Sequence, residues 1–149
     1  MLDRINTVSA DAPDWSREKP RRFWDPGRKL LRALRDYQRR SRWNPLRKAA
    51  VLRHAFWSAV AGADIPLNCK IGGGLLIPHP NGVVIHPEAE IGVNCLIFQQ
   101  VTIGTGCGVG TPRLGGHVDV GAGAKILGGV VLEPHTRVRA NAVISPSAS

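Results

Sequence analysis

The sequence lacks the features that would place the chain in a membrane or export it. It contains no apolar run of about 18 residues or more, the length needed to cross the hydrocarbon core of a bilayer as a helix. Residues 1–15 include acidic side chains and no apolar core, unlike a secretory signal peptide. We therefore expect a cytoplasmic protein.

Cysteine is scarce, and its spacing matches no known framework. The three cysteines, Cys69, Cys95 and Cys107, are an odd number and form no C-x-x-C pair, which argues against both a disulfide framework and a zinc site. Glycine is common, but the stretch GTGCGVG spells neither G-x-G-x-x-G nor G-x-x-x-x-G-K-[ST]. Neither a resident metal nor a nucleotide bound through such a loop is predicted.

Acidic residues are few, and the resulting net charge of +9 comes from one part of the chain. Residues 17–53 carry fourteen of the twenty Lys and Arg against three Asp and Glu, whereas residues 64–149 carry five of each. Such a basic segment has three alternative explanations. It could be a solvated helix surface, it could contact an anionic membrane surface at the inner face of the membrane, or it could attract the phosphates of a ligand. Nucleic acid is not a predicted partner, because the four tryptophans are better explained as packing residues than as base-stacking platforms.

The first part of the chain divides into an arm and two helices. Residues 1–27 are polar, contain three prolines and show neither the helix nor the strand period, so we expect a loosely ordered arm. Residues 28–40 have apolar side chains at helical spacing among basic ones. Residues 45–61 follow an Asn-Pro start signal and end before Gly62. Residues 28–62 are therefore predicted to form two basic amphipathic helices.

The later half of the second helix is apolar almost all round. Its sequence, AAVLRHAFWSAVAGA, indicates burial against the rest of the chain, a partner subunit or a bilayer surface. Burial within the protein is the commoner case and is the one we expect.

From Ile65 onward an aliphatic residue recurs at every sixth position. In this six-residue register Val83 is counted as a repeat position. The register then slips by two residues across the segment HPEAE. It breaks again at the loop GTGCGVGTPR and continues to Ile144. The fifth position of each hexad is usually small or apolar, and the position after the aliphatic residue is often glycine, as at Gly72, Gly92, Gly104, Gly115 and Gly121. Three hexads form one triangular coil, so the thirteen phased positions predict rather more than four coils.

This period resembles that of the hexapeptide-repeat acyltransferases. The resemblance implies that residues 63–149 form a left-handed parallel β-helix, an exception to the usual handedness of parallel crossovers. A short stack of coils exposes apolar sides, and members of that family bury these sides by trimerising around a threefold axis. We therefore expect a homotrimer, or two trimers joined through their helices.

Within this class, four segments resemble serine acetyltransferases: ADIPLNCKIG, IPHPNGVVI, FQQVTIG and VGAGAKILGG. The resemblance implies an acetyl-CoA-dependent O-acetyltransferase. It places His79 at the family's general base, which takes the proton of the acceptor hydroxyl as that oxygen attacks the acetyl thioester. It places Asp64, fifteen residues upstream, at the carboxylate that orients this histidine.

The same resemblance implies acetyl-CoA as the co-substrate. In this family the pantetheine arm is held mainly by backbone groups, so small residues matter more than functional side chains. By resemblance, Ala122, Gly123 and Ala140 line that slot, and the loop that begins with Gly104 and Thr105 closes over it.

Three positions near the acceptor depart from the family's pattern. Pro78 replaces an Asp that helps to bind the amino acid, and Gly110 and Thr111 stand at the Arg and His of an R-H-P element. A zwitterion left unpaired in a partly buried site binds poorly. The acceptor is therefore either L-serine or, slightly favoured by these departures, a sugar hydroxyl in surface or exopolysaccharide biosynthesis.

Two other interpretations stay open. A γ-carbonic-anhydrase-like metal enzyme on this fold needs three converging histidines, and only His79 and His117 have a suitable separation. His117 and His135 fall at corner positions of their hexads, and His54 falls within a helix. A non-catalytic trimeric scaffold would use its helices to bind a partner or a membrane.

Overall fold

The amino-terminal third of the chain is helical. The computed structural model describes residues 8–106 and 109–146. A short 3-10 helix, η1 (Trp15–Glu18), is followed by α1 (Pro26–Arg39) and α2 (Pro45–Ala61). None of the helices in these ranges is long and apolar enough to span a membrane.

The rest of the described chain consists of very short strands separated by corners. They are β1 (Lys70–Ile71), β2 (Val84–Ile85), β3 (Glu90–Ile91), β4 (Leu96–Ile97), β5 (Thr102–Gly104), β6 (Arg113–Leu114), β7 (Asp119–Val120), β8 (Lys125–Leu127), β9 (Val131–Leu132), β10 (Arg137–Val138) and β11 (Val143–Ile144).

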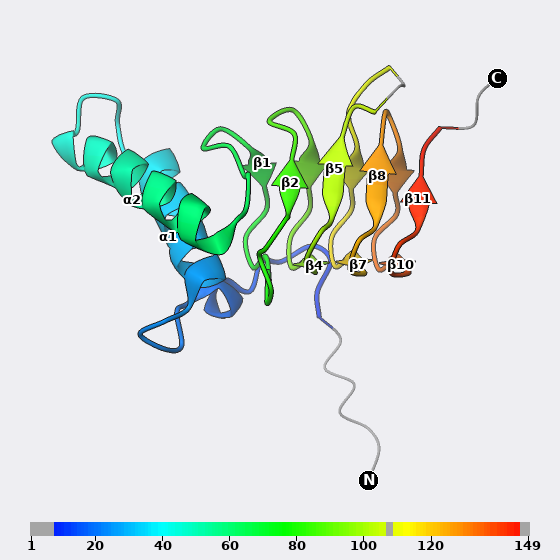
Figure 1. The fold of residues 1–149 in the computed structure, drawn as a ribbon, viewed down its shortest axis with the longest axis horizontal. Coiled ribbons are helices and arrows are strands. Elements are labelled where there is room, and N and C mark those ends of the chain that lie inside the picture. Colours follow the sequence, from blue (N-terminus) through cyan, green and yellow to red (C-terminus); the bar gives the residue numbers. More distant parts are fainter. Residues whose placement is uncertain (1–7, 107–108, 147–149) are drawn as a thin grey trace, which may run out of the picture.

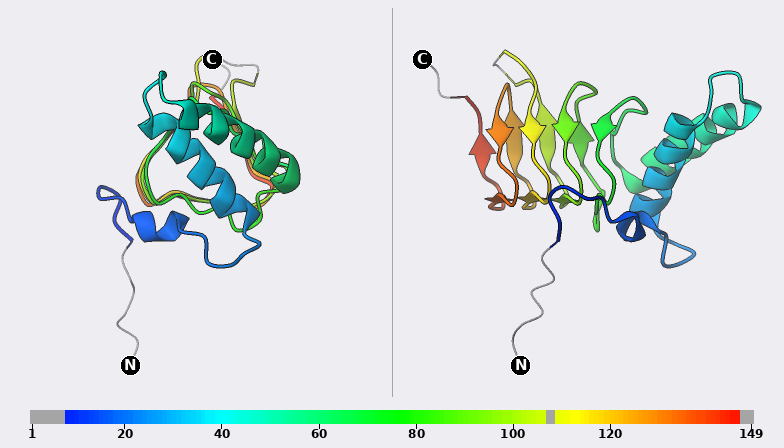
Figure 2. Two further views of the ribbon diagram at one scale, coloured as in Figure 1. Left: turned by 90° about the vertical axis from the view of Figure 1, so that its left-hand side faces the viewer. Right: turned by 180° about the vertical axis from the view of Figure 1, so that it is seen from behind.

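These strands form three parallel sheets that the chain visits in turn. The strand orders are β1-β3-β6-β9, β4-β7-β10 and β2-β5-β8-β11, called below the β1, β4 and β2 sheets. Figure 1 shows the coils stacked side by side, and the end-on view in Figure 2 shows their triangular outline. The predicted parallel β-helix preceded by two helices is confirmed.

The phased aliphatic residues form columns inside the β-helix. Within each two-residue strand the first side chain points outward and the second inward, because successive side chains of a strand alternate. In the β2 sheet, Ile85, Ile103 and Ile126 are stacked in register and are buried. Burying each such side chain stabilises the fold by roughly 1.5–3 kcal/mol.

The break in the hexad phase lies earlier than we predicted. Ile85, and not Val83, pairs with Ile103 in the column of the β2 sheet, and Ile85 leads to Ile91 after the regular six residues. The two extra residues therefore lie in the corner between Ile77 and Ile85 and not across HPEAE. Val83 and Ile85 are both buried apolar residues two positions apart, so the sequence pattern alone was ambiguous.

The corners between the sheets lie along three edges of the triangular prism, and the third, between the β2 and β1 sheets, carries the long loop after β5. The other two edges are named here. We call the edge between the β4 and β2 sheets the His79 edge; it comprises residues 78–82, 98–101, 121–124 and 139–142. We call the edge between the β1 and β4 sheets the arm edge; it comprises residues 72–75, 92–95, 115–118 and 133–136.

Helix α1 closes the amino-terminal end of the β-helix, as Figure 1 shows. Its buried residues Leu30, Leu31 and Leu34 belong to the same apolar cluster as the first coil. It begins two residues before the predicted start, because Pro26 occupies the first helical turn. Helix α2 has its predicted bounds.

Both predicted end signals of α2 are used. The Asn44 side chain accepts a hydrogen bond from the amide of Leu46, and Gly62 ends the helix with a φ of 64°. The expected burial of α2 within the chain is wrong, however. Only Ala50 and Ala61 among its residues are buried, and of its large apolar side chains Trp57 alone packs partly buried against the core.

The described part of the arm is not loosely ordered, in contrast to our expectation. It follows the arm edge of the β-helix, as Figures 1 and 2 show. The buried Asn94 amide donates to the carbonyls of Ser9 and Ala12 and accepts from the amide of Asp14. The Arg17 side chain donates to the carbonyl of Gly74 at 2.8 Å. Residues 1–7 of the predicted arm lie outside the described residues.

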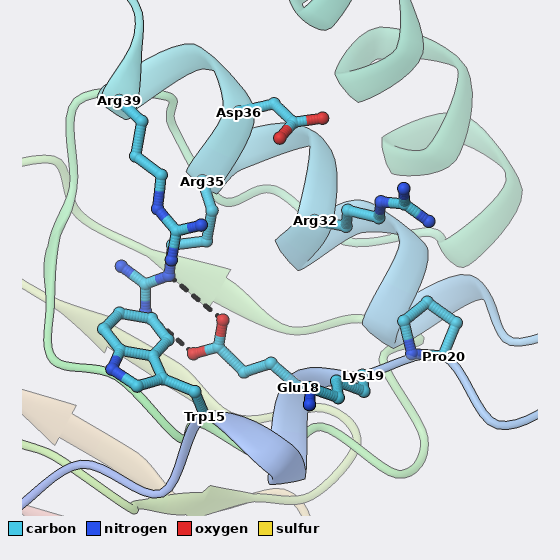
Figure 3. Close-up of a pocket in the computed structure, with 8 residues that line it drawn as sticks. All are labelled: Trp15, Glu18, Lys19, Pro20, Arg32, Arg35, Asp36 and Arg39. Atoms are coloured by element: carbon cyan, nitrogen blue, oxygen red, sulfur yellow. Dashed lines mark hydrogen bonds and ion pairs between the residues drawn. The ribbon is translucent and has the colours of Figure 1, made fainter.

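A buried ion pair joins the arm, α1 and the β-helix, and Figure 3 shows it at the wall of a cavity of about 380 Å³. Arg35 donates twice to the Glu18 carboxylate, at 2.9 and 3.1 Å, and also to the carbonyls of Ile71 and Gly72. Glu18 in turn accepts from the amide of Gly74 at 2.9 Å. The cavity is therefore a structural junction whose central charges are already paired.

Candidate active site

His79 lies in the enlarged corner that carries the two extra residues. This corner, Pro78 to Gly82, connects Ile77 of the β4 face to β2 and makes the His79 edge bulge at the first coil. The His79 side chain is exposed. The departure from the six-residue period thus coincides with the residue that resemblance identifies as the general base.

The two helices hold this corner from both sides. A Cβ atom on Gly27 would lie 2.5 Å from the carbonyl oxygen of Ile77, so α1 approaches the corner as closely as a glycine allows. The amide of Gly82 donates to the carbonyl of Gly62, at the end of α2, at 2.7 Å. On the side of the next coil, Gln100 donates to Asn81 through its backbone and its side chain.

Asp64 follows α2 directly and is fixed through its backbone. It forms a parallel bridge with Val84, in which its amide donates to the carbonyl of Val83 and its carbonyl accepts from the amide of Ile85. Its side chain is exposed. Between these two fully described residues, no hydrogen bond or ion pair joins the carboxylate to the His79 ring, so their pairing stays a prediction.

Three predicted coenzyme residues lie along the same edge as His79. Ala122 and Gly123 form the corner of one coil, and Ala140 forms the corner of the next. The carbonyl of Ala122 accepts from the amide of Asn141 at 2.8 Å, which keeps the two corners in register. Their small side chains leave the backbone of this edge accessible, as a slot for a pantetheine arm requires.

Gly104 and Thr105 begin the long loop after β5. A Cβ atom on Gly104 would meet no atom within 4 Å, and Thr105 is exposed, so nothing in the described chain covers this point. Cys107 falls in the same loop but lies outside the described residues.

Lys125 is a candidate that sequence reasoning missed. Its ammonium donates to the carbonyls of Gly123 and Gln100, at 3.0 and 3.3 Å, which places a positive charge on the His79 edge. Its one sequence signal is its place in the segment VGAGAKILGG, and only the coil brings its ammonium beside Gly123.

The cysteines that the structure describes are structural. Burial raises the pKa of the Cys69 thiol to about 12 and that of the Cys95 thiol to about 11. Both side chains are buried in the β-helix wall, as the fifth-position pattern predicted. A thiol that stays protonated is a poor nucleophile and a poor metal ligand.

The other histidines lie elsewhere. His54 contacts the carbonyl of Ile65 through Nε2 at 2.8 Å, and His86, which we did not single out, accepts at Nδ1 from the amide of Glu88. His117 and His135 meet edge-to-face on the arm edge, with their Nδ1 atoms 2.7 Å apart.

No set of metal ligands emerges from this arrangement. Within the described ranges of the chain, no three His, Cys, Asp or Glu side chains converge on one point. A γ-carbonic-anhydrase-like site thus gains no support from the protomer.

The residues that replace the family's acceptor-binding groups have structural roles. The Thr111 hydroxyl donates to the carbonyl of Glu88 at 3.1 Å, and Gly110 has a φ of 91° within the loop. Pro78 lines a groove of about 290 Å³ together with Arg21, Arg22 and Arg28, the last of which pairs with Asp25 at 3.3 Å. A net positive charge therefore lies next to the predicted base.

No family model matches the chain, but individual proteins do. It is 46% identical to the serine acetyltransferase of Helicobacter pylori strain J99 over 88 residues, which are 57% of this chain and 52% of that protein. It is 38% identical to the serine acetyltransferase of Mycobacterium tuberculosis over 112 residues, 71% of this chain and 49% of that protein. The chain thus spans about half the length of the curated relatives it matches.

Solved structures agree with the sequence comparison. Serine acetyltransferase isoform 3 of Entamoeba histolytica, in complex with cysteine, superposes with a TM-score of 0.68 at 26% identity, over 85% of this chain and 50% of that one. A serine acetyltransferase in complex with CoA gives 0.66 at 29% identity, over 81% and 50%. The chain therefore resembles serine acetyltransferases in both sequence and fold, as its motifs predicted.

Proposed function

We propose that the protein is an acetyl-CoA-dependent O-acetyltransferase with His79 as its general base. The observation that carries this proposal is the common edge: in a chain similar to serine acetyltransferases, His79, Ala122, Gly123 and Ala140 line one edge of the β-helix. The related structure in complex with CoA supports acetyl-CoA as the donor.

In the proposed reaction, His79 removes the proton of the acceptor hydroxyl while that oxygen attacks the thioester carbonyl. The tetrahedral intermediate collapses, the acetyl group stays on the acceptor oxygen, and the departing thiolate of CoA takes the proton from the imidazolium. Asp64 would accept a hydrogen bond from the other ring nitrogen. Such hydrogen bonds often form fully only when substrate is bound.

The donor would lie along the His79 edge. Its pantetheine arm would follow the backbone at Ala122 and Ala140. The loop from Gly104 leaves the other end of β5, on the edge between the β2 and β1 sheets, so it would cover the arm of a donor bound to a neighbouring copy in the proposed trimer. Lys125 would attract the phosphates of CoA, because its ammonium lies at the same corner.

The acceptor is the hydroxyl of L-serine or of a sugar. The relatives' activity favours serine. The replacements Pro78, Gly110 and Thr111 favour a sugar of surface polysaccharide synthesis, because none of them can pair with the ammonium or carboxylate of an amino acid.

We also propose a homotrimer. The outward-facing Val84 and Val143 lie exposed on the same β2 sheet, and packing between copies would bury them. Multi-angle light scattering on the full chain tests this, and a monomer at micromolar concentration would contradict it.

A thiol-release assay with acetyl-CoA tests the proposed base. The variant His79→Ala is expected to lose activity by about 10²–10⁴-fold, the usual contribution of a general base, while keeping its affinity for CoA. The matched control is His135→Ala, which removes an exposed histidine from the arm edge. Unchanged turnover in His79→Ala would contradict the proposed mechanism. Absence of turnover in the parent chain would favour the alternative of a non-catalytic trimeric scaffold.

The same assay distinguishes the acceptors. L-Serine and a panel of sugars are compared by kcat/KM under one set of conditions. Rapid turnover of serine would show that Pro78, Gly110 and Thr111 are tolerated by an amino-acid site, and turnover of a sugar alone would support the polysaccharide interpretation.

A further inference from the structure

Helix α2 presents an apolar stripe to solvent along its whole length. Leu46, Ala49, Leu52 and Phe56 are spaced three or four residues apart, so they lie on one face of the helix. All four are exposed, Leu46 by 53%, Leu52 by 73% and Phe56 by 57%. We call these residues the α2 stripe. Exposed apolar surface of this extent indicates a binding surface.

Large aromatic side chains are exposed in the same helical region. Phe23 is 89% exposed and Trp43, in the loop before α2, is 81% exposed. Trp24 packs edge-to-face on Trp57 of α2, with ring centroids 5.7 Å apart, and Trp57 contacts Phe56 in the same way. The α2 stripe therefore continues into an aromatic cluster.

Cations accompany this apolar surface. The guanidinium of Arg42 lies 4.9 Å from the ring centre of Trp43, and the ammonium of Lys29 lies 5.2 Å from that of Phe23. Lys48 is exposed on α2 itself. Most of these charges have no acidic neighbours to offset them, since residues 17–53 contain only three acidic residues, and two of those, Glu18 and Asp36, pair with Arg35 and Arg53.

The charge decides which occupant fits. A second copy of the same surface would bring two strongly positive regions together, which like-charge repulsion opposes. A nucleic acid would be attracted by the cations, but it would leave the leucines exposed. A bilayer with anionic lipids accommodates both features, because apolar and aromatic side chains enter the interface while cations meet the headgroups.

We propose that the α2 stripe, with Phe23, Trp43 and the neighbouring cations, docks on an anionic lipid surface. The helix would lie in the plane of the interface. Because α2 leads through Gly62 directly to Asp64 and holds Gly82, docking would keep the His79 edge close to the bilayer. This last consequence rests on the proposed function, whereas the docking itself does not.

Vesicle co-sedimentation of the full chain tests the docking. Vesicles of phosphatidylcholine alone are compared with vesicles in which about a third of the lipid is phosphatidylglycerol. Binding is expected only to the anionic vesicles, and it should weaken strongly at about 0.5 M salt, where surface charges are screened. Equal binding to both compositions would overturn the electrostatic part of the proposal.

A pair of variants tests the residues. Leu52→Ser with Phe56→Ser is expected to weaken vesicle binding by on the order of a hundredfold. The matched control, Val131→Ser, changes an exposed apolar residue of β9, outside the helices, and should bind normally. Since all three positions are exposed, unchanged circular dichroism should verify that both proteins fold.

Three results would overturn the proposal. The parent chain could fail to bind anionic vesicles. The Leu52/Phe56 variant could bind them normally. It could also lose an oligomer that the parent forms, with no change in lipid affinity, which would assign the stripe to a second copy of the chain. Measuring acetyl transfer to a soluble acceptor in parallel keeps a failure of docking separate from a failure of the proposed activity.

Discussion

The β-helix and the helical region reach order by different routes. In the β-helix every coil repeats the same inward column, and its charges balance, with five of each sign in residues 64–149. The arm and helices have fourteen Lys and Arg against three acidic residues in residues 17–53 and expose most of α2. The β-helix is stabilised by its own repeat, whereas the amino-terminal region takes its order from docking on that repeat.

Ion pairs show the same contrast. In the helical region, Glu18 and Arg35 are buried and surrounded by further hydrogen bonds. On the β1 sheet, Glu90 lies between Lys70 and Arg113 at 3.3 and 3.6 Å, with all three side chains well exposed. A buried pair cannot lose one partner without leaving an uncompensated charge, whereas water replaces the partner of an exposed one.

The largest expected effect is in the β-helix core. The variant Ile103→Ala should lower the free energy of unfolding by about 4 kcal/mol, because it removes buried methyl groups and leaves a cavity in a closely packed column. Urea unfolding measures this, with Val131→Ala as the exposed control at below about 1 kcal/mol. Similar losses in both variants would contradict the assignment of Ile103 to the core.

The next effect is in the junction between the two regions. Glu18→Ala should cost about 3 kcal/mol, since it leaves the Arg35 guanidinium buried without its carboxylate. It should also detach the arm, so that trypsin cleaves faster at Arg21 and Arg22. The exposed counterpart Glu90→Gln should cost less than about 1 kcal/mol. If both variants lost the same stability, the contrast between the regions would fail.

The smallest expected effect appears at alkaline pH. The pKa values of Cys69 and Cys95 are raised by burial to about 12 and about 11, above their unfolded value near 9. The stability contributed by the protonated thiols is therefore fully present below about pH 9 and lost as pH rises toward the folded values.

The expected size of this loss is about 1 kcal/mol for each thiol at pH 10. Urea midpoints of the parent chain and of Cys69→Ala with Cys95→Ala, taken at pH 8 and pH 10, measure it. The double variant should lose less stability over this interval. A pH dependence identical to that of the parent would show that the thiols do not titrate as inferred.

Local sequence patterns predicted the helix bounds but not the position at which the six-residue register shifts. The second helix was predicted at about residues 45–61 and is found at Pro45–Ala61, because its end signals Asn44, Pro45 and Gly62 each act within a single turn. The corner at Pro78–Gly82 was misplaced, because Val83 and Ile85 are equally apolar. Only pairing with Ile103 of the next coil selects Ile85 for the column.

For the candidate site, the sequence supplied identities and the fold supplied neighbours. His79 and the small corner residues were identified from motifs, and the structure brings them to one edge. Lys125 was missed because its interest lies in a charge placed beside Gly123 by the coil, and no spacing rule predicts such a placement. The partnership of His79 with Asp64 stays a prediction.

By itself, the sequence determined the β-helix and the two helices, because a six-residue period and helix end signals depend on residues close in the chain. Tertiary structure alone decided that the arm is ordered and that α2 is exposed. The Asn94 side chain donates to the carbonyl of Ser9 in the arm, and the Glu18 carboxylate of the arm accepts from the amide of Gly74. These contacts join residues far apart in the chain, so no local period records them. The exposure of α2 is a tertiary property, because it depends on how much of the helix surface packs against the rest of the chain.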